Sequence, residues 1–173
     1  STTVGADGDG IITINGGDYI TFDGIDLNSN SFAAGADMYE YGYYFKKAAS
    51  NNASKNVTIK NSSITLNKNA IFSFGIYVSN FYNTVVANVV SNGGRTENIK
   101  LDSNTISNCY GGIQLRGVND ADFYDQNIEV GVQYGNNISG FGGAGSIAYG
   151  IYAIYQNNLK IVKNSVVSAL GNT

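Results

Sequence analysis

Apolar residues recur along this chain in short alternating pairs rather than at helical spacing. In the stretch 56–66, NVTIKNSSITL, the apolar residues Val57 and Ile59 are followed, after four polar residues, by Ile64 and Leu66. Alternation of apolar and polar positions is typical of a strand with one buried face. The polar residues between the two pairs therefore predict a corner that joins two short strands.

The same arrangement returns several times along the chain. The alternating pairs that we expect to face a core are Ile20/Phe22, Val57/Ile59, Ile99/Leu101 and Leu159/Ile161. Each pair is followed by another apolar residue, at Leu27, Ile64, Ile106 and Val166, and a shortened copy is closed by Ile138. The residues between the members of each pair are polar, as outward strand positions should be: Thr21, Thr58, Lys100 and Lys160.

A second repeated element begins with glycine. Its copies are GYYF (42–45), GIYV (75–78), GIQL (112–115) and GIYA (150–153), which start 33, 37 and 38 residues apart. The residues one and three after each glycine are mostly apolar, so the middle residue should point outward. These middle residues are Tyr44, Tyr77, Gln114 and Tyr152.

The fixed order of the two elements predicts an all-β, right-handed parallel β-helix. Strands this short form no stable sheet alone, but stacked repeats let each strand pair with its equivalents above and below. We expect a single segment over 1–173, with about four to five coils and loops protruding at 30–41, 46–55, 88–97 and 140–149. An antiparallel sandwich is the alternative for short strands and glycine-rich turns. It gives no reason for the two elements to alternate.

The corner of each repeat is rich in asparagine and serine. Examples are Asn61–Ser62, Ser103–Asn104 and Lys163–Asn164. Asparagine tolerates left-handed backbone angles, and its side chain bonds to nearby backbone groups. Stacked asparagine side chains from successive coils are also expected to bond to one another.

The two ends of the chain carry no capping pattern. We therefore expect it to be a fragment of a longer repeat protein, because uncovered strand edges invite pairing with other chains. Neighbouring domains of the same chain, or an assembly such as secretion machinery, would cover those edges.

The composition limits the classes of function. The formal net charge is −3 with 13% charged residues, and the ten lysines and arginines are scattered, which argues against nucleic acid as a partner. No apolar run is long enough to insert in a membrane. The chain has no histidine, so it contains neither a Ser-His-Asp triad nor a Cys/His zinc site. The single Cys109 is expected to be a small buried residue.

The longer repeats resemble those of a known group of proteins. The segments GDYITFDGIDL (17–27), EYGYYFKKAASNNASKNVTIKNSSITLN (40–67) and AYGIYAIYQNNLKIVKNSVV (148–167) resemble right-handed parallel β-helix repeats of large secreted and cell-surface proteins from Bacteroidota-type bacteria. The resemblance implies a secreted or cell-surface location and export by a type IX route. The wider superfamily that it resembles includes pectate lyases, polygalacturonases and phage tailspikes.

An acidic cluster offers one candidate for catalysis. Asp120, Asp122 and Asp125 lie close together in NDADFYDQ (119–126), and Arg116 precedes them. Carboxylates in this arrangement suit the general acid and base of a glycosidase, or Ca²⁺ ligands of a lyase. A solvated acidic loop between coils is the structural alternative, and it is favoured.

A second acidic motif suggests a cation site. Asp7 and Asp9 alternate with glycine in VGADGDG (4–10), as in the first half of a Ca²⁺-binding loop. Residue 11 is Ile, where a third oxygen ligand is expected, so a turn is the favoured interpretation. No cofactor other than Ca²⁺ is suggested.

The outward tyrosines offer a candidate binding surface. Tyr44, Tyr77 and Tyr152 are expected to form a column, with Tyr39, Tyr41, Phe81, Tyr82 and Tyr149 contributed by loops. Tyrosine rings give stacking surface with a hydroxyl group, which suits sugar rings or a protein partner. The alternative is that tyrosine simply favours exposed strands.

Three classes of function follow. The first is a non-catalytic structural or adhesive module that contacts glycans or proteins. The second is a polysaccharide lyase or glycoside hydrolase. The third is a binder of a crystalline surface such as ice, which is disfavoured because Lys100 and Lys160 interrupt the column of Thr21 and Thr58.

Overall fold

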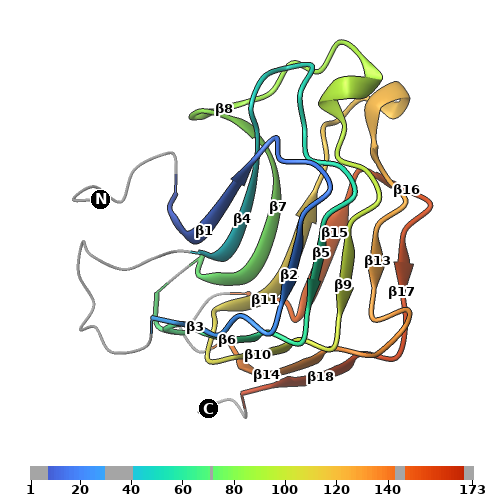
Figure 1. Ribbon diagram of the computed structural model, residues 1–173. Helices are drawn as coiled ribbons and strands as arrows, with labels where there is room; N and C mark the ends of the chain where they lie inside the picture. The colour runs from blue at the N-terminus through green and yellow to red at the C-terminus, as the bar shows by residue number, and fades with distance from the viewer. Residues whose placement is uncertain (1–7, 30–40, 71, 143–146, 170–173) are drawn as a thin grey trace.

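Three parallel sheets wind around one core in the computed structural model of this chain (Figure 1). The structure describes residues 8–29, 41–70, 72–142 and 147–169. Each sheet runs along the stack, and each coil contributes one strand to each sheet. The fold is therefore an all-β parallel β-helix, as the sequence predicts, and the antiparallel sandwich is wrong.

The strands of the first sheet come from the glycine-led elements. Its order is β1 (Gly10–Asn15), β4 (Tyr41–Lys47), β7 (Phe74–Tyr82), β11 (Gly111–Arg116) and β15 (Ile151–Ile154). All these neighbours pair in parallel. The short β8 (Val85–Val86) folds back antiparallel on β7.

The other two large sheets come from the two halves of the asparagine-containing repeat. One has the order β2 (Thr21–Asp23), β5 (Thr58–Lys60), β9 (Lys100–Asp102), β13 (Glu129–Val130) and β17 (Lys160–Ile161). The other has the order β3 (Leu27–Asn28), β6 (Ser63–Thr65), β10 (Thr105–Ser107), β14 (Asn137–Phe141) and β18 (Ser165–Ser168). A small fourth sheet pairs β12 (Asp125–Gln126) with β16 (Gln156–Asn157).

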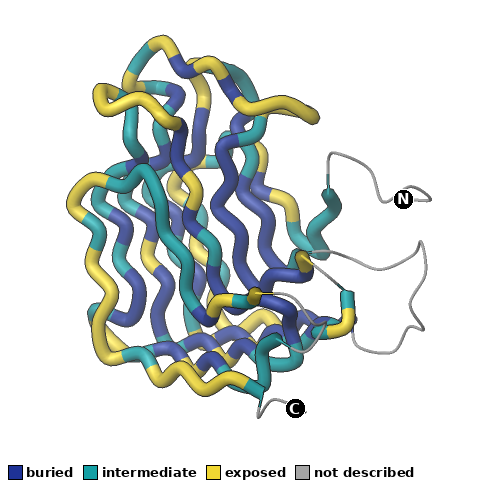
Figure 2. The backbone as a smooth tube through the Cα atoms, turned by 180° about the vertical axis from the view of Figure 1, so that it is seen from behind, coloured by how far each residue is buried: buried dark blue, intermediate teal, exposed yellow. Residues whose placement is uncertain are grey.

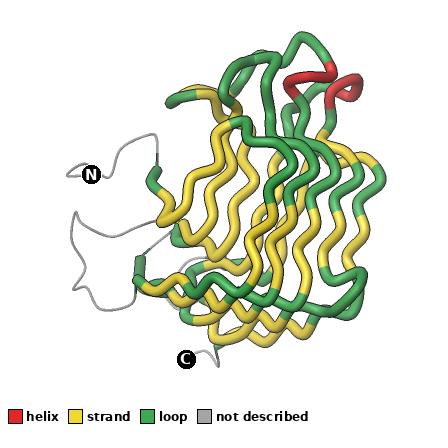
Figure 3. The backbone as a smooth tube through the Cα atoms, viewed as in Figure 1, coloured by secondary structure: helices red, strands yellow, loops and turns green. Residues whose placement is uncertain are grey.

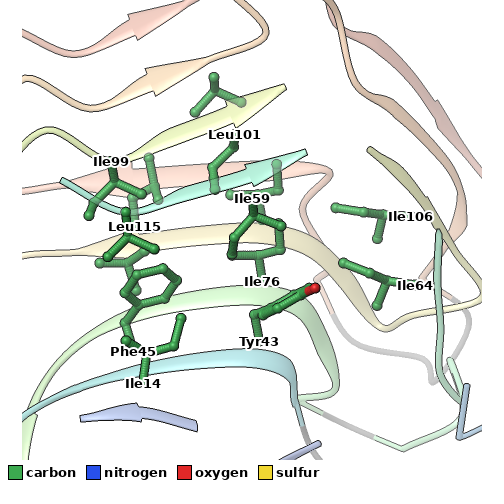
Figure 4. Packing of buried hydrophobic residues seen from close by; sticks show 14 of the residues in the cluster. Ile14, Tyr43, Phe45, Ile59, Ile64, Ile76, Ile99, Leu101, Ile106 and Leu115 are labelled. Carbon is green, nitrogen blue, oxygen red and sulfur yellow. The ribbon is translucent and has the colours of Figure 1, made fainter. Parts of the chain in front are cut away.

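The inward columns form the core (Figure 4). Ile59, Ile64 and Ile76 come from one coil and face one another from the three sheets, and each is fully buried. Their equivalents in the next coil, Leu101 and Ile106, stack directly on them. Burial of one such side chain contributes about 1.5–3 kcal/mol, so the stack of columns is the main source of stability.

Two expected core residues of the last coil are exposed. Ile161 and Val166 pair with the buried Val130 and Ile138, yet they are 42% and 44% exposed. They occupy the inward columns as predicted, but no described coil stacks on their far side. Figure 2 shows the resulting gradient, with buried residues in the middle coils and exposed ones along the last coil.

The glycine at the start of each first-sheet strand has a steric cause. A Cβ on Gly75 would lie 2.4 Å from the Ile106 side chain. A Cβ on Gly112 would lie 2.3 Å from the carbonyl oxygen of Gly150 in the following coil. The chain enters the first sheet here in close contact with the next coil, so only glycine fits.

Residues with a left-handed backbone conformation flank the second sheet at both of its corners. One column contains Tyr19, Asn56, Asn98, Asn127 and Asn158, all with φ between 53° and 58°. The other contains Gly24, Asn61, Ser103, Gly131 and Lys163, also with positive φ. The expected left-handed corner at Asn61 is confirmed, and the asparagine content has its cause in this backbone requirement.

Asparagine ladders are present, as expected. In the interior, Nδ2 of Asn104 donates to Oδ1 of Asn136 at 3.0 Å, and Nδ2 of Asn136 donates to Oδ1 of Asn164 at 2.8 Å. A second ladder, nearer the surface, links Asn158 to Asn127, Asn127 to Asn98 and Asn98 to Asn56. Each ladder satisfies polar side chains at a corner where the backbone turns.

Loops gather at one end of the coil cross-section, which also contains the helical turns η1 (Asn92–Gly94) and η2 (Ala121–Phe123), seen in Figure 3, and β8, labelled in Figure 1. The expected loop 88–97 contains η1. Most of the expected loop 30–41 and part of 140–149 lie outside the described residues. Within the described ranges, no helix has the length and apolar character needed to cross a membrane.

We predict that Asn136→Ala lowers the free energy of unfolding by about 2–4 kcal/mol, because several buried hydrogen bonds lose their partner. Its side chain bonds to both neighbouring ladder asparagines, and it also donates to the carbonyl oxygen of Leu101 at 2.8 Å. Urea unfolding measures the loss. The adjacent exposed Asn137 provides the control, and an equal loss for Asn137→Ala would contradict a special contribution from the ladder.

Candidate functional site: an aromatic groove beside a buried ion pair

The tyrosine column does not form the open surface that the sequence suggests. Tyr44 and Tyr77 point away from the main core, and their rings stack with centroids 5.6 Å apart. However, they are only 2% and 4% exposed, so the expectation of exposed rings is wrong at these two positions. The third member, Tyr152, is partly exposed and pairs with the ring of Tyr149 at 5.0 Å.

Neighbouring aromatic residues cause this burial. The side chains of Phe74 and Tyr110 pack with Tyr44 and Tyr77 into a second apolar cluster outside the first sheet, joined at its edge by Tyr41. Gly111 lies in register with Phe74, and a Cβ there would come within 2.3 Å of the Phe74 ring. The missing side chain at Gly111 thus leaves the space that this ring fills.

A groove of about 290 Å³ opens over this cluster. We call it the aromatic groove. Its wall consists of aromatic residues with one aliphatic and two polar side chains: Tyr41, Phe72, Phe74, Tyr77, Tyr110, Gln114, Arg116, Ile147, Tyr149 and Tyr152. The volume is at the lower end of the range for small-molecule sites.

Three rim residues of the aromatic groove expose large apolar surface. Phe72 is 63% exposed, Ile147 is 77% exposed and Tyr149 is 44% exposed. Phe72 also has a φ of +73°, which is an unusual backbone conformation for an aromatic residue. The Tyr110 hydroxyl donates to the carbonyl oxygen of Ile147 and so ties one rim segment to the floor of the groove.

Two polar groups give the aromatic groove directional contacts. Arg116 ends β11 and is exposed, and Gln114 lies two residues before it on the same face. Burial raises the pKa of Tyr77, while the charge of Arg116 and its hydrogen bond to the hydroxyl act in the opposite direction. The phenol therefore stays protonated, and the groove offers cationic and neutral donors beside its rings.

The acidic candidates lie in different environments. Asp122 lies on η2 and Asp120 caps its start; both are exposed, and the Asp120 carboxylate accepts a hydrogen bond from the Asp122 backbone N–H at 3.1 Å. Asp125 is fully buried. Arg116 lines the aromatic groove. The observed contacts of Asp120 fit a turn cap, and the catalytic assignment of these residues stays a prediction.

The calcium candidate is only partly described. Asp7 lies outside the described residues, and the backbone carbonyl of Asp9 accepts a hydrogen bond from Tyr41 at 3.0 Å. In the described part of the chain, no three His, Cys, Asp or Glu side chains gather closely enough to hold a metal ion. The weak assignment of Asp7 and Asp9 to Ca²⁺ therefore gains no support.

Asp125 forms an ion pair inside the coil stack. Its Oδ1 lies 3.5 Å from Nζ of Lys47, and both side chains are 0% exposed. The same oxygen accepts a hydrogen bond from the Thr96 backbone at 2.8 Å. Burial raises the pKa of Asp125, opposed by the charge of Lys47, and burial lowers the pKa of Lys47, opposed by Asp125.

The outer face of the second sheet is a mixed charged row. Thr21 and Thr58 are in register with Lys100, Glu129 and Lys160, and Glu129 lies between the two lysines as their ion-pair partner. A flat threonine face of the kind that an ice binder presents is therefore restricted to the first two coils.

Comparisons with known protein families, with curated proteins and with solved structures gave no significant match. The parallel β-helix architecture implied by the resemblance of the repeats is present in the structure. The bacterial group and the secretion route implied by the same resemblance have no support from the comparisons.

Cys109 is predicted to be unreactive in the folded protein. It is fully buried, and burial raises the pKa of its thiol to about 12. A thiol-specific chromogenic reagent at mild alkaline pH should therefore label it only after denaturant is added, since the thiolate is the reactive form. Rapid labelling under native conditions would contradict the burial of this residue.

Proposed function

We propose that this chain is a non-catalytic structural and adhesive β-helix module that contacts a glycan through the aromatic groove. The observation that carries this proposal is the partly exposed pair Tyr149 and Tyr152, set beside Gln114 and Arg116 in one concave site. Tyrosine rings stack on the apolar faces of sugar rings, and amide and guanidinium groups bond to sugar hydroxyls or carboxylates. Gln114 and Arg116 lie on β11 and Tyr152 lies on β15, so the first sheet positions three of these four groups.

We further propose that the parent protein is secreted or lies on the bacterial cell surface. The resemblance of the repeats supports this location and export by a type IX route. Partners other than a glycan would then be a surface protein, secretion machinery or neighbouring domains of the same chain. Nucleic acid fits poorly, because the net charge is −3 and the aromatic groove contains a single cationic side chain.

A polysaccharide lyase or glycoside hydrolase is the second candidate. The observation in its favour is that Arg116, the basic residue that precedes the acidic cluster in the sequence, lines the aromatic groove. Turnover of acidic or neutral polysaccharides, with and without Ca²⁺, tests this activity. Turnover that Asp122→Asn abolishes would favour the enzyme and contradict a purely structural module.

For the adhesive function, we predict that Tyr149→Ala and Tyr152→Ala each weaken glycan binding about tenfold, because loss of one stacked ring removes roughly 1.4 kcal/mol. A glycan array identifies the ligand, and titration calorimetry with that ligand measures the change. Tyr134 is 62% exposed and is not among the residues that line the aromatic groove, so Tyr134→Ala is the matched control.

Two results would count against the proposal. The first is an array on which this chain binds no glycan. The second is an equal loss of affinity for Tyr134→Ala, which would place binding outside the aromatic groove.

A further inference from the structure

Lys47 and Asp125 come from coils that are far apart in sequence, and their side chains meet in the buried interior. Lys47 is the last residue of β4, and Asp125 is the first residue of β12. The other ion pairs found among the described residues, such as Lys60–Asp23 and Lys160–Glu129, keep both side chains partly exposed. The pair of Lys47 and Asp125 therefore has an environment unlike theirs.

As ions, both side chains would have too few hydrogen-bond partners. Nζ of Lys47 has three protons to donate when charged, and its polar neighbours are Oδ1 of Asp125 at 3.5 Å and the Thr96 hydroxyl at 3.4 Å. Oδ2 of Asp125 is buried and has no hydrogen-bond partner. Desolvation of each ion costs several kcal/mol, and long contacts recover little of that cost.

Proton transfer from Nζ of Lys47 to the Asp125 carboxylate would relieve this cost. Burial raises the pKa of Asp125 and lowers the pKa of Lys47, so the shifts favour a neutral carboxylic acid beside a neutral amine. These are the two forms that react to give an amide. Fixed proximity supplies a large effective concentration of one reactant for the other, and the 0% exposure of both side chains keeps bulk water away from the pair.

We propose that Lys47 and Asp125 condense to form an isopeptide bond inside the coil stack. The lone pair of Nζ attacks Cγ of Asp125 and forms the new N–C bond. Negative charge then develops on Oδ1, which faces the backbone N–H of Thr96 at 2.8 Å. This N–H is placed to stabilise that oxygen, as in an oxyanion hole.

The leaving group is Oδ2. It departs as water with its own proton and one proton from the amine, and the C–Oδ2 bond breaks. The Thr96 hydroxyl, 3.4 Å from Nζ, relays the amine proton. The products are one amide and one water molecule, so the step needs no oxidant, reductant or metal. Two buried groups that burial disfavours as ions are replaced by a neutral amide whose oxygen keeps the Thr96 hydrogen bond.

Lys60 and Asp23 provide a matched comparison. Their Nζ and Oδ2 atoms are closer, at 3.1 Å, but the side chains are 40% and 51% exposed. Hydrogen bonds from Asn61 and Lys60 lower the pKa of Asp23, so this carboxyl stays ionised. If closeness alone caused condensation, this surface pair would react first. If the dry interior is required, only Lys47 and Asp125 react.

Mass spectrometry tests the proposal. The folded chain is incubated, unfolded in denaturant and weighed intact, together with Lys47→Met and Lys60→Met. We expect the unsubstituted chain and Lys60→Met to be lighter than their sequences by one water molecule, and Lys47→Met to have its full mass. Proteolysis should then give a branched peptide that joins the segments containing Lys47 and Asp125.

The branched peptide is the deciding observation. Succinimide formation at Asp23–Gly24 also removes one water molecule, but it gives no branch. A chain that keeps its full mass after prolonged incubation in the folded state would show that Lys47 and Asp125 form an ion pair only, and the proposal would be wrong. A branch at Lys60 would equally overturn it. Because the peptide map uses the unsubstituted chain, the test holds even if Lys47→Met does not fold.

Discussion

Backbone hydrogen bonding between equivalent positions of successive coils is the constraint on which the rest of this structure depends. Strands of two to nine residues are too short to persist alone, and each is held by the strand before and after it. Pairing must stay in register around the whole coil, because a shift of one residue would turn every core side chain outward. Several sequence features serve this one requirement.

The corners are where that constraint is most demanding. To keep each strand above its equivalent, the chain turns sharply at the same place in every coil, and asparagine or glycine accepts the left-handed angle there. The close approach of the following coil at Gly75 and Gly112 is a second consequence of stacking, because a side chain at either position would collide with that coil. The glycine-led element and the asparagine-rich corner are thus both consequences of stacking, and neither requires a functional explanation.

The fold could be predicted from the sequence because the pattern of core positions is local. The alternation of Val57 and Ile59 predicts a strand from a few neighbouring residues, and the recurrence of such pairs predicts the stack of coils.

The aromatic groove could be predicted only in part. Tyr152 follows from the repeat, but the burial of Tyr44 and Tyr77 depends on Phe74 and Tyr110 of other segments. Phe72 and Ile147 lie in loops with no repeated pattern. The buried ion pair was also missed, because Lys47 looked like a loop residue and its partner lies two coils away.

The two asparagine ladders run in opposite directions along the stack. In the interior ladder each amide donates toward the C-terminal coil, from Asn104 to Asn136 to Asn164. In the outer ladder each amide donates toward the N-terminal coil, from Asn158 back to Asn56. Side-chain amides are dipoles, so two rows of opposite polarity largely cancel. A long stack built on this plan can add coils while the dipoles of its two ladders continue to oppose each other along the axis.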